Sequence, residues 1–93
     1  MGGSRTVHVL FFASARELTG VSSVDITLEE KEKSGEEVGC TAKSLVAVLT
    51  RTYEYLDFEK HQISLAVNKE YITDDVILRD GDEVALLPPI AGG

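Results

Sequence analysis

The chain has 93 residues, enough for one domain with a single hydrophobic core. Its formal net charge of -7, from 16 acidic and 9 basic residues, argues against nucleic acid as a direct partner, because phosphate binding needs a basic surface. No apolar run reaches membrane-spanning length, and the one cysteine, Cys40, cannot form an internal disulfide. We therefore expect a cytosolic protein that does not bind membranes.

The first predicted element is a strand over residues 5–12, which are rich in β-branched and aromatic side chains. Side chains alternate between the two faces of a strand. We assign one face to the core; it carries Val7, Val9 and Phe11. The other face also becomes apolar toward its end, at Leu10 and Phe12, which predicts either a second covered surface or a surface offered to a partner.

A short helix, a second strand and a loop are predicted next. Residues 13–19 favour a helix that Gly20 can end as a C-cap. Residues 21–28 alternate between apolar and polar side chains, so we expect a strand that forms a hairpin with the first. Residues 29–40 are dense in charge and have almost nothing to bury, which predicts a flexible acidic surface loop.

One long amphipathic helix is predicted over residues 42–55, with Thr41 as its N-cap. Its apolar stripe should pack on the sheet. Cys40 lies just before this helix, where a thiol can be activated. We interpret Cys40 as a packing or surface residue, with a nucleophile as the alternative.

Three further strands are predicted at residues 63–67, 71–72 and 83–87, with turns at Asn68-Lys69 and Asp80-Gly81. This order of elements predicts a small α+β domain in which one long helix lies across a mixed sheet. The first and last strands are both strongly apolar, so we expect them to pair in parallel at its centre. That pairing would bring the C-terminal tail to the same end of the sheet as the first strand's end.

Residues 88–93 form the predicted tail. Pro88 and Pro89 hold the chain extended, and the side-chain-free Gly92 and Gly93 could pass through a narrow channel. Six extended residues reach about 20 Å. Gly93 ends in a carboxylate that can form new bonds once it is activated, so we predict Gly93 as the functional site. The alternative is an ordinary frayed terminus.

The remaining residues show no pattern of a catalytic or metal site. Two histidines and one cysteine, without suitable spacing, make no metal-ligand cluster. We therefore predict that the chain binds no metal or cofactor and is not catalytic by itself. The clustered acidic residues lack the spacing of a calcium loop and are interpreted as turn and surface residues: Asp74, Asp75, Asp80, Asp82 and Glu83.

Three segments resemble the small subunits of molybdopterin synthase, a family of ubiquitin-like sulfur carriers. They are VLFFA with ARELTG in residues 9–20, AVN with EY in residues 66–71, and DGDEVALLPPI leading to the terminal Gly-Gly. The last segment is the specific one, because Gly-Gly alone would fit any ubiquitin-like protein. Ala91 stands where the family often has Ser or Thr, a change that we expect to be tolerated.

The resemblance implies a β-grasp fold and a mechanism. An activating enzyme would use ATP to adenylate the carboxylate of Gly93, and sulfur would then replace AMP to give a thiocarboxylate. The tail would insert into a pocket of the large subunit, where the sulfur attacks the cyclic pterin precursor to build the molybdopterin dithiolene. The tail residues that the resemblance assigns to insertion are Pro88, Pro89, Ile90, Ala91 and Gly92.

By the same resemblance, Phe12, Tyr71 and Leu87 match positions that contact the large subunit, with ordinary core residues as the alternative. Catalytic groups would belong to the large subunit. Three other functions stay open: a sulfur carrier for thiamine or tRNA thiolation, a ubiquitin-like protein modifier, and an interaction domain whose Gly-Gly has no role.

Overall fold

The computed structural model describes residues 3–29, 31–33, 36–38 and 40–89. Neither of the helices in these ranges is long and apolar enough to cross a membrane. The elements follow one another as β1 (Ser4–Phe11), α1 (Ala13–Thr19), β2 (Ser23–Glu29), β3 (Lys31–Lys33), β4 (Glu36–Val38), α2 (Ala42–Thr52), β5 (Ser64–Val67), β6 (Glu70–Ile72) and β7 (Glu83–Leu87).

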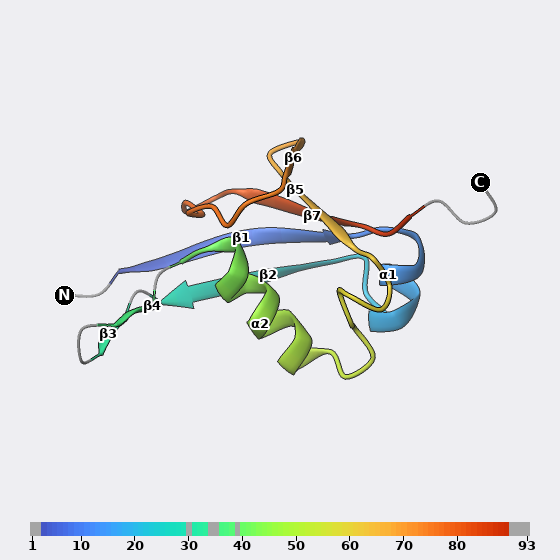
Figure 1. Ribbon diagram of the computed structural model, residues 1–93, viewed down its shortest axis with the longest axis horizontal. Coiled ribbons are helices and arrows are strands. Elements are labelled where there is room, and N and C mark those ends of the chain that lie inside the picture. The colour runs from blue at the N-terminus through green and yellow to red at the C-terminus, as the bar shows by residue number, and fades with distance from the viewer. Residues whose placement is uncertain (1–2, 30, 34–35, 39, 90–93) are drawn as a thin grey trace.

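Five strands form one mixed sheet in the order β2-β1-β7-β5-β6 (Figure 1). β1 pairs antiparallel with β2 and parallel with β7, and β5 pairs antiparallel with both β7 and β6. The predicted α+β class, the hairpin and the central parallel pair are all confirmed, and each of these strands begins and ends within two residues of its prediction. β1 and β7 therefore end at the same end of the sheet.

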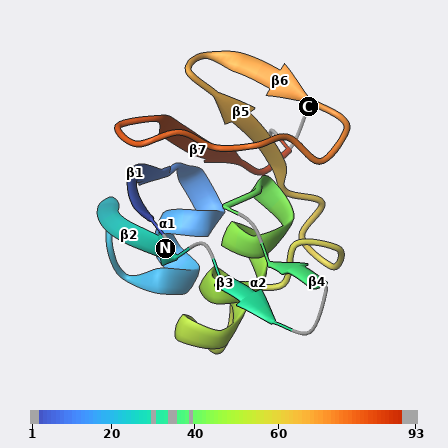
Figure 2. The ribbon, with the colours of Figure 1, turned by 90° about the vertical axis from the view of Figure 1, so that its left-hand side faces the viewer.

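Both helices lie on one side of the sheet, which arches over them in Figure 2. The apolar side chains of β1 and β7 that face this side are fully or almost fully buried, because alternation directs every second residue toward the helices. The opposite side, which we call the open face, is covered by neither helix. The core consists of Val7, Val9, Phe11, Ala15, Leu28, Cys40, Leu45, Leu49, Leu56, Leu78, Val84 and Leu86.

The ends of the two helices can be compared with the capping signals predicted from the sequence. The hydroxyl of Thr41 accepts the Ser44 N–H at 3.2 Å, which confirms the predicted N-cap of α2. Gly20 adopts a left-handed conformation with φ of 79° and ends α1 as predicted. The predicted end of α2 at residue 55 is wrong, since Tyr53 is extended and its ring packs edge-on against Phe11, with 5.5 Å between ring centroids.

Residues 29–40, predicted as a loop, differ from that prediction in the parts that the structure describes. Glu29 is the last residue of β2, and β3 pairs with β4 in a two-stranded antiparallel ribbon. The register pairs Lys31 with Val38, Glu32 with Glu37 and Lys33 with Glu36. Figure 1 shows the ribbon at the end of the sheet opposite to the end of β7. The ribbon therefore does not shape the region from which the tail leaves.

Candidate functional site

The site begins where β7 ends. Leu87 is the last strand residue, and Pro88 cannot donate to the strand ladder, so the pairing stops there. The Phe12 N–H donates to the Leu86 carbonyl at 3.4 Å, which ties the end of β1 to the end of β7. The structure thus brings Phe12 and the start of the tail together, as the parallel pairing predicts. Ile90, Ala91, Gly92 and Gly93 lie outside the described residues, and their roles stay predictions.

An apolar row crosses the open face close to this end. The pairing registers place Leu10 of β1 opposite Ala85 of β7, Ala85 opposite Ala66 of β5, and Ala66 opposite Tyr71 of β6. The two alanines are small, so Leu10 and Tyr71 are the large side chains of this row. We call these four residues the apolar row.

The three residues predicted to contact a partner differ in burial. Phe12 is 44% exposed and Tyr71 is 72% exposed, so neither is an ordinary core residue. Leu87 is half-buried and stands opposite Ser64 of β5. By alternation Leu87 lies on the same face as Ala85, next to the apolar row. Large exposed apolar side chains on one uncovered face are typical of a contact surface, but the contact itself stays a prediction.

Sequence reasoning missed the two alanines of the apolar row. The signal was available in the alternation of Leu65-Ala66-Val67 and Val84-Ala85-Leu86, in which the alanine is the outward residue of each triplet. An alanine that faces outward on a central strand gives no recognisable signal when each strand is considered alone. Only the pairing register shows that the two alanines are neighbours and that they lie between Leu10 and Tyr71.

The clustered acidic residues hold turns and a helix start, as interpreted from the sequence. Asp80 accepts the Thr6 N–H at 2.7 Å, and Asp75 accepts the Lys43 N–H at 2.8 Å at the first turn of α2. Asp82 accepts hydrogen bonds from the Arg79 N–H and the Asn68 side-chain amide, which lower the pKa of its carboxyl group below the usual value. Within the described ranges, no group of three or more potential metal-binding side chains is assembled.

Cys40 is 1% exposed, and its thiol lies 3.5 Å from the Leu28 carbonyl, to which it donates. This burial confirms the interpretation of Cys40 as a packing residue. A buried thiol with a main-chain partner is not placed to attack a substrate.

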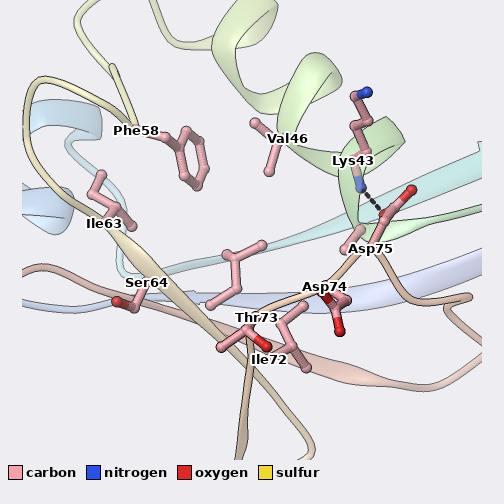
Figure 3. A pocket seen from close by; sticks show the side chains of 11 residues that line it. Lys43, Val46, Phe58, Ile63, Ser64, Ile72, Thr73, Asp74 and Asp75 are labelled. Carbon is pink, nitrogen blue, oxygen red and sulfur yellow. Dashed lines mark hydrogen bonds between the residues drawn. The ribbon is translucent and has the colours of Figure 1, made fainter.

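A groove of about 420 Å³ lies between α2 and the β5–β6 hairpin (Figure 3). Val46, Phe58 and Ile63 supply part of its apolar lining, and Lys43 and Asp75 stand together on one side. The Asp75 carboxylate already accepts the Lys43 N–H. The ionisable residues of the described lining are Lys43, Asp74 and Asp75.

The sheet order, the single long helix across it and the open face define a β-grasp domain of the ubiquitin-like class. Solved structures with this fold include the small archaeal modifier protein 1 of Methanosarcina acetivorans, with a TM-score of 0.73 over 98% of this chain and 99% of that chain at 24% identity. The chain belongs to the ThiS family, whose family model matches residues 9–93. This membership agrees with the resemblance noted in the sequence.

Curated relatives are similar along nearly the whole chain. The molybdopterin synthase sulfur carrier subunit of Arabidopsis thaliana is 39% identical over 87 residues, covering 94% of this chain and 82% of that protein. The human protein of the same name is 34% identical over 90 residues, covering 94% and 93%. A solved complex of subunits 1 and 2 of the molybdopterin-converting factor from Helicobacter pylori matches with 28% identity and a TM-score of 0.63, covering 95% of this chain and 99% of that chain.

Proposed function

We propose that this chain is the sulfur carrier subunit of a molybdopterin synthase and acts in the cytosol together with a large subunit. The observation that carries the proposal is the parallel pairing of β1 with β7, which brings the exposed Phe12 beside the start of the C-terminal tail. A protein that delivers a group on its terminus needs this arrangement, since docking and delivery then occur at the same end of the molecule. The similarity to sulfur carrier subunits along nearly the whole chain supports it.

The chemistry takes place at Gly93. In the first step, an oxygen of its carboxylate attacks the α-phosphorus of ATP, pyrophosphate leaves, and an acyl adenylate forms. A sulfur nucleophile at the oxidation level of sulfide then attacks the carbonyl carbon. AMP leaves with the former carboxylate oxygen, and the terminus becomes a thiocarboxylate. Adenylation is needed because a free carboxylate has no adequate leaving group, whereas AMP is a good one.

The tail carries this sulfur to the large subunit. Pro88 and Pro89 restrict the backbone to extended conformations and so set the direction of the segment that follows. Six extended residues reach about 20 Å, enough to enter a pocket while the domain stays outside it. Gly92 adds no side chain next to the reacting atoms, so the channel around it can be narrow and can exclude water.

The activating enzyme, the large subunit and this chain would each have a separate task. We propose that the activating enzyme binds ATP, that the large subunit binds the pterin precursor and supplies acid–base groups, and that this chain holds no cofactor of its own. Phe12, Tyr71 and Leu87 would then form the apolar contact with the large subunit. Their positions on and beside the apolar row support this assignment.

Reconstitution tests the proposal. The chain with a thiocarboxylate at Gly93 is mixed with the large subunit of the same organism and the cyclic pterin precursor, and the dithiolene product is quantified by mass spectrometry. We expect product with the full chain and none with a chain that lacks Gly92 and Gly93. Absence of product with the full chain, in an assay that works with another sulfur carrier subunit, would contradict the proposal.

The alternatives give different results in parallel assays. A carrier for thiamine or tRNA thiolation would pass its sulfur to the enzymes of those pathways and not to the pterin precursor. A protein modifier would form covalent high-mass adducts in cells through Gly93, and a dedicated sulfur carrier would form few or none. An interaction domain would keep its activity after removal of the two terminal glycines.

A further inference from the structure

The open face is divided into an apolar and a polar part. One two-residue step from the apolar row, the pairing registers place Asp25 of β2 opposite His8 of β1, and His8 opposite Glu83 of β7. A two-residue step along a strand is about 7 Å. Three adjacent strands thus present a line of titratable side chains parallel to the apolar row. We call Asp25, His8 and Glu83 the acidic strip.

Hydrogen bonding fixes what the acidic strip offers to a partner. The Nδ1 atom of His8 and the Oδ1 atom of Asp25 are 2.6 Å apart, and the two side chains are 48% and 67% exposed. A carboxylate only accepts hydrogen bonds, so the Nδ1–H group of His8 donates to Asp25. The strip therefore offers the carboxylate oxygens of Asp25 and Glu83 as acceptors, which suit a partner side chain that only donates hydrogen bonds.

The backbone beneath the strip is held in place. The Glu83 N–H donates to the Asn68 side-chain oxygen at 3.0 Å, and the Asn68 N–H donates to the Glu83 carbonyl at 2.7 Å. The His8 N–H donates to the Asp82 carbonyl at 2.8 Å. These bonds anchor β1 and β7 to the neighbouring turns, so a partner meets Glu83 and His8 at fixed points of the strands.

The charged residues in and around the acidic strip have a negative net charge. Asp80 and Asp82 lie just before Glu83 and use their carboxylates on backbone and amide donors. The neighbouring turns contribute two exposed cations, Lys69 and Arg79. With Asp25 and Glu83 added, these carboxylates outnumber the two cations. A cationic side chain approaching here is attracted, and an anionic one is repelled.

We infer that the acidic strip is a second contact surface, which binds a lysine or arginine side chain of the large subunit about one two-residue step from the apolar contact. The inference rests on the proposed function. The acceptor chemistry of the strip identifies the occupant as a donor-only cation, and its continuity with the apolar row on one uncovered face places both contacts on the same partner. The strip accelerates association and sets the register in which the apolar row docks.

A pair of isosteric substitutions tests the inference. Asp25→Asn combined with Glu83→Gln removes both charges, keeps the side-chain shapes and leaves an amide oxygen at position 25 that can still accept from His8. The matched control is Glu54→Gln combined with Glu59→Gln. This variant removes the same number of negative charges, but from the exposed segment that follows α2. Association with the large subunit is measured by stopped flow or surface plasmon resonance between about 0.02 and 0.3 M salt.

We expect the strip variant to associate about three- to tenfold more slowly than the unaltered chain at low salt and with a shallower salt dependence, while the control stays within about twofold. Equal slowing in the strip variant and the control would overturn the inference, because net charge alone would then explain the effect. Unchanged association of the strip variant would also overturn it, and the proposed function would stand. Failure of the unaltered chain to bind the large subunit at all would contradict the proposed function, and the inference with it.

Discussion

Phe11 and Phe12 are neighbours in the sequence and differ fully in environment. Phe11 is 1% exposed and contacts the ring of Tyr53 in the core, whereas Phe12 is 44% exposed on the open face. The alternation of β1 explains the difference, since consecutive side chains point to opposite faces. Phenylalanine therefore packs in the core at position 11 and lies on the surface at position 12.

This contrast gives a prediction for the pair. Phe12→Asp should weaken binding of the large subunit by about 2 kcal/mol or more, as expected for a buried aromatic contact, and should change the free energy of unfolding by less than about 1 kcal/mol. Phe11→Ala, the matched core change, should cost about 3–5 kcal/mol of stability. Binding is measured by calorimetry and stability by urea denaturation. A loss of stability in Phe12→Asp as large as in Phe11→Ala would show that Phe12 belongs to the core.

The hydrogen bonds of Asp82 lead to a prediction about how stability depends on pH in acid. Its backbone bond from Arg79 and its amide bond from Asn68 stabilise the charged form and lower its pKa in the folded state. Its stabilising contribution is therefore complete above the unfolded-state pKa of about 3.9, and it is lost as the pH falls through the lower folded-state value.

Asp82→Asn should accordingly reduce the steepness with which the free energy of unfolding falls below about pH 4, and should cost about 1 kcal/mol or less at pH 7 because the site is partly exposed. Denaturation titrations at several pH values measure both effects, with Asp74→Asn in the neighbouring exposed loop as the control. An acid dependence identical to that of the unaltered chain would contradict the role assigned to Asp82.

At the scale of elements, the β5–β6 turn contains a local conflict between sequence and conformation. Asn68 and Lys69 both have positive φ, 51° and 73°, which is the pattern of a type I′ hairpin turn. Asparagine tolerates this conformation, but lysine has a Cβ atom that makes the left-handed region costly.

Lys69→Gly should therefore raise the free energy of unfolding by about 0.5–1 kcal/mol, after the greater backbone entropy of glycine is allowed for. Lys69→Ala keeps the Cβ atom and serves as the control that should give no such gain. Thermal or urea denaturation measures both variants. A loss of stability in Lys69→Gly would contradict the strain assigned to this turn.

Most elements could be predicted because their signals are local. The Thr41 cap, Gly20 and the apolar alternation of β1 and β7 act over a few residues, and the structure confirms each of them. The C-terminal end of α2 could not be predicted in this way. Tyr53 and Leu56 continue the helical spacing of apolar residues, but tertiary contacts hold them in the core from a non-helical segment. The sequence thus predicted correctly that these two residues contact the core, but it wrongly predicted that the helix continues to residue 55.

The β3–β4 ribbon shows a related limit. Its sequence is dense in lysine and glutamate, a composition that indicates a loop when burial is the only criterion. The ribbon is nevertheless formed by backbone pairing over three residues of each strand. Cross-strand register is not visible in a single strand, so this pairing has no direct signal in the sequence.

At the scale of the whole molecule, the domain and the tail have separate tasks. Within the described residues, every member of the core lies between Val7 and Leu86. A change in the tail should consequently affect delivery of sulfur without affecting folding. This separation is what allows docking and insertion to be tested independently.

Gly92→Leu tests this separation. The added side chain should block passage through the channel of the large subunit and reduce sulfur transfer by about 100-fold or more, with the melting temperature unchanged. Single-turnover transfer and thermal denaturation measure the two effects, and Ala91→Ser, a change between small side chains, is the control. Normal transfer by Gly92→Leu would show that no narrow channel surrounds the tail.

The site could be predicted only in part, because its components come from distant parts of the chain. The tail motif and Phe12 were visible in the sequence, and the parallel pairing of β1 with β7 brings Phe12 to the start of the tail. The apolar row and the acidic strip depend on registers across three or four strands, and these are fixed by the fold as a whole. Alternation within single strands indicates only which residues are available for such rows.

The most direct test of the central claim is the intact mass of the chain after incubation with ATP, the activating enzyme of its host and a sulfur donor. We expect the mass increase of one oxygen replaced by one sulfur, and we expect no increase in a chain that lacks Gly92 and Gly93. That result would establish Gly93 as the site of a thiocarboxylate. An unchanged mass, with the same enzyme shown to modify another carrier, would contradict the assignment of this chain as a sulfur carrier.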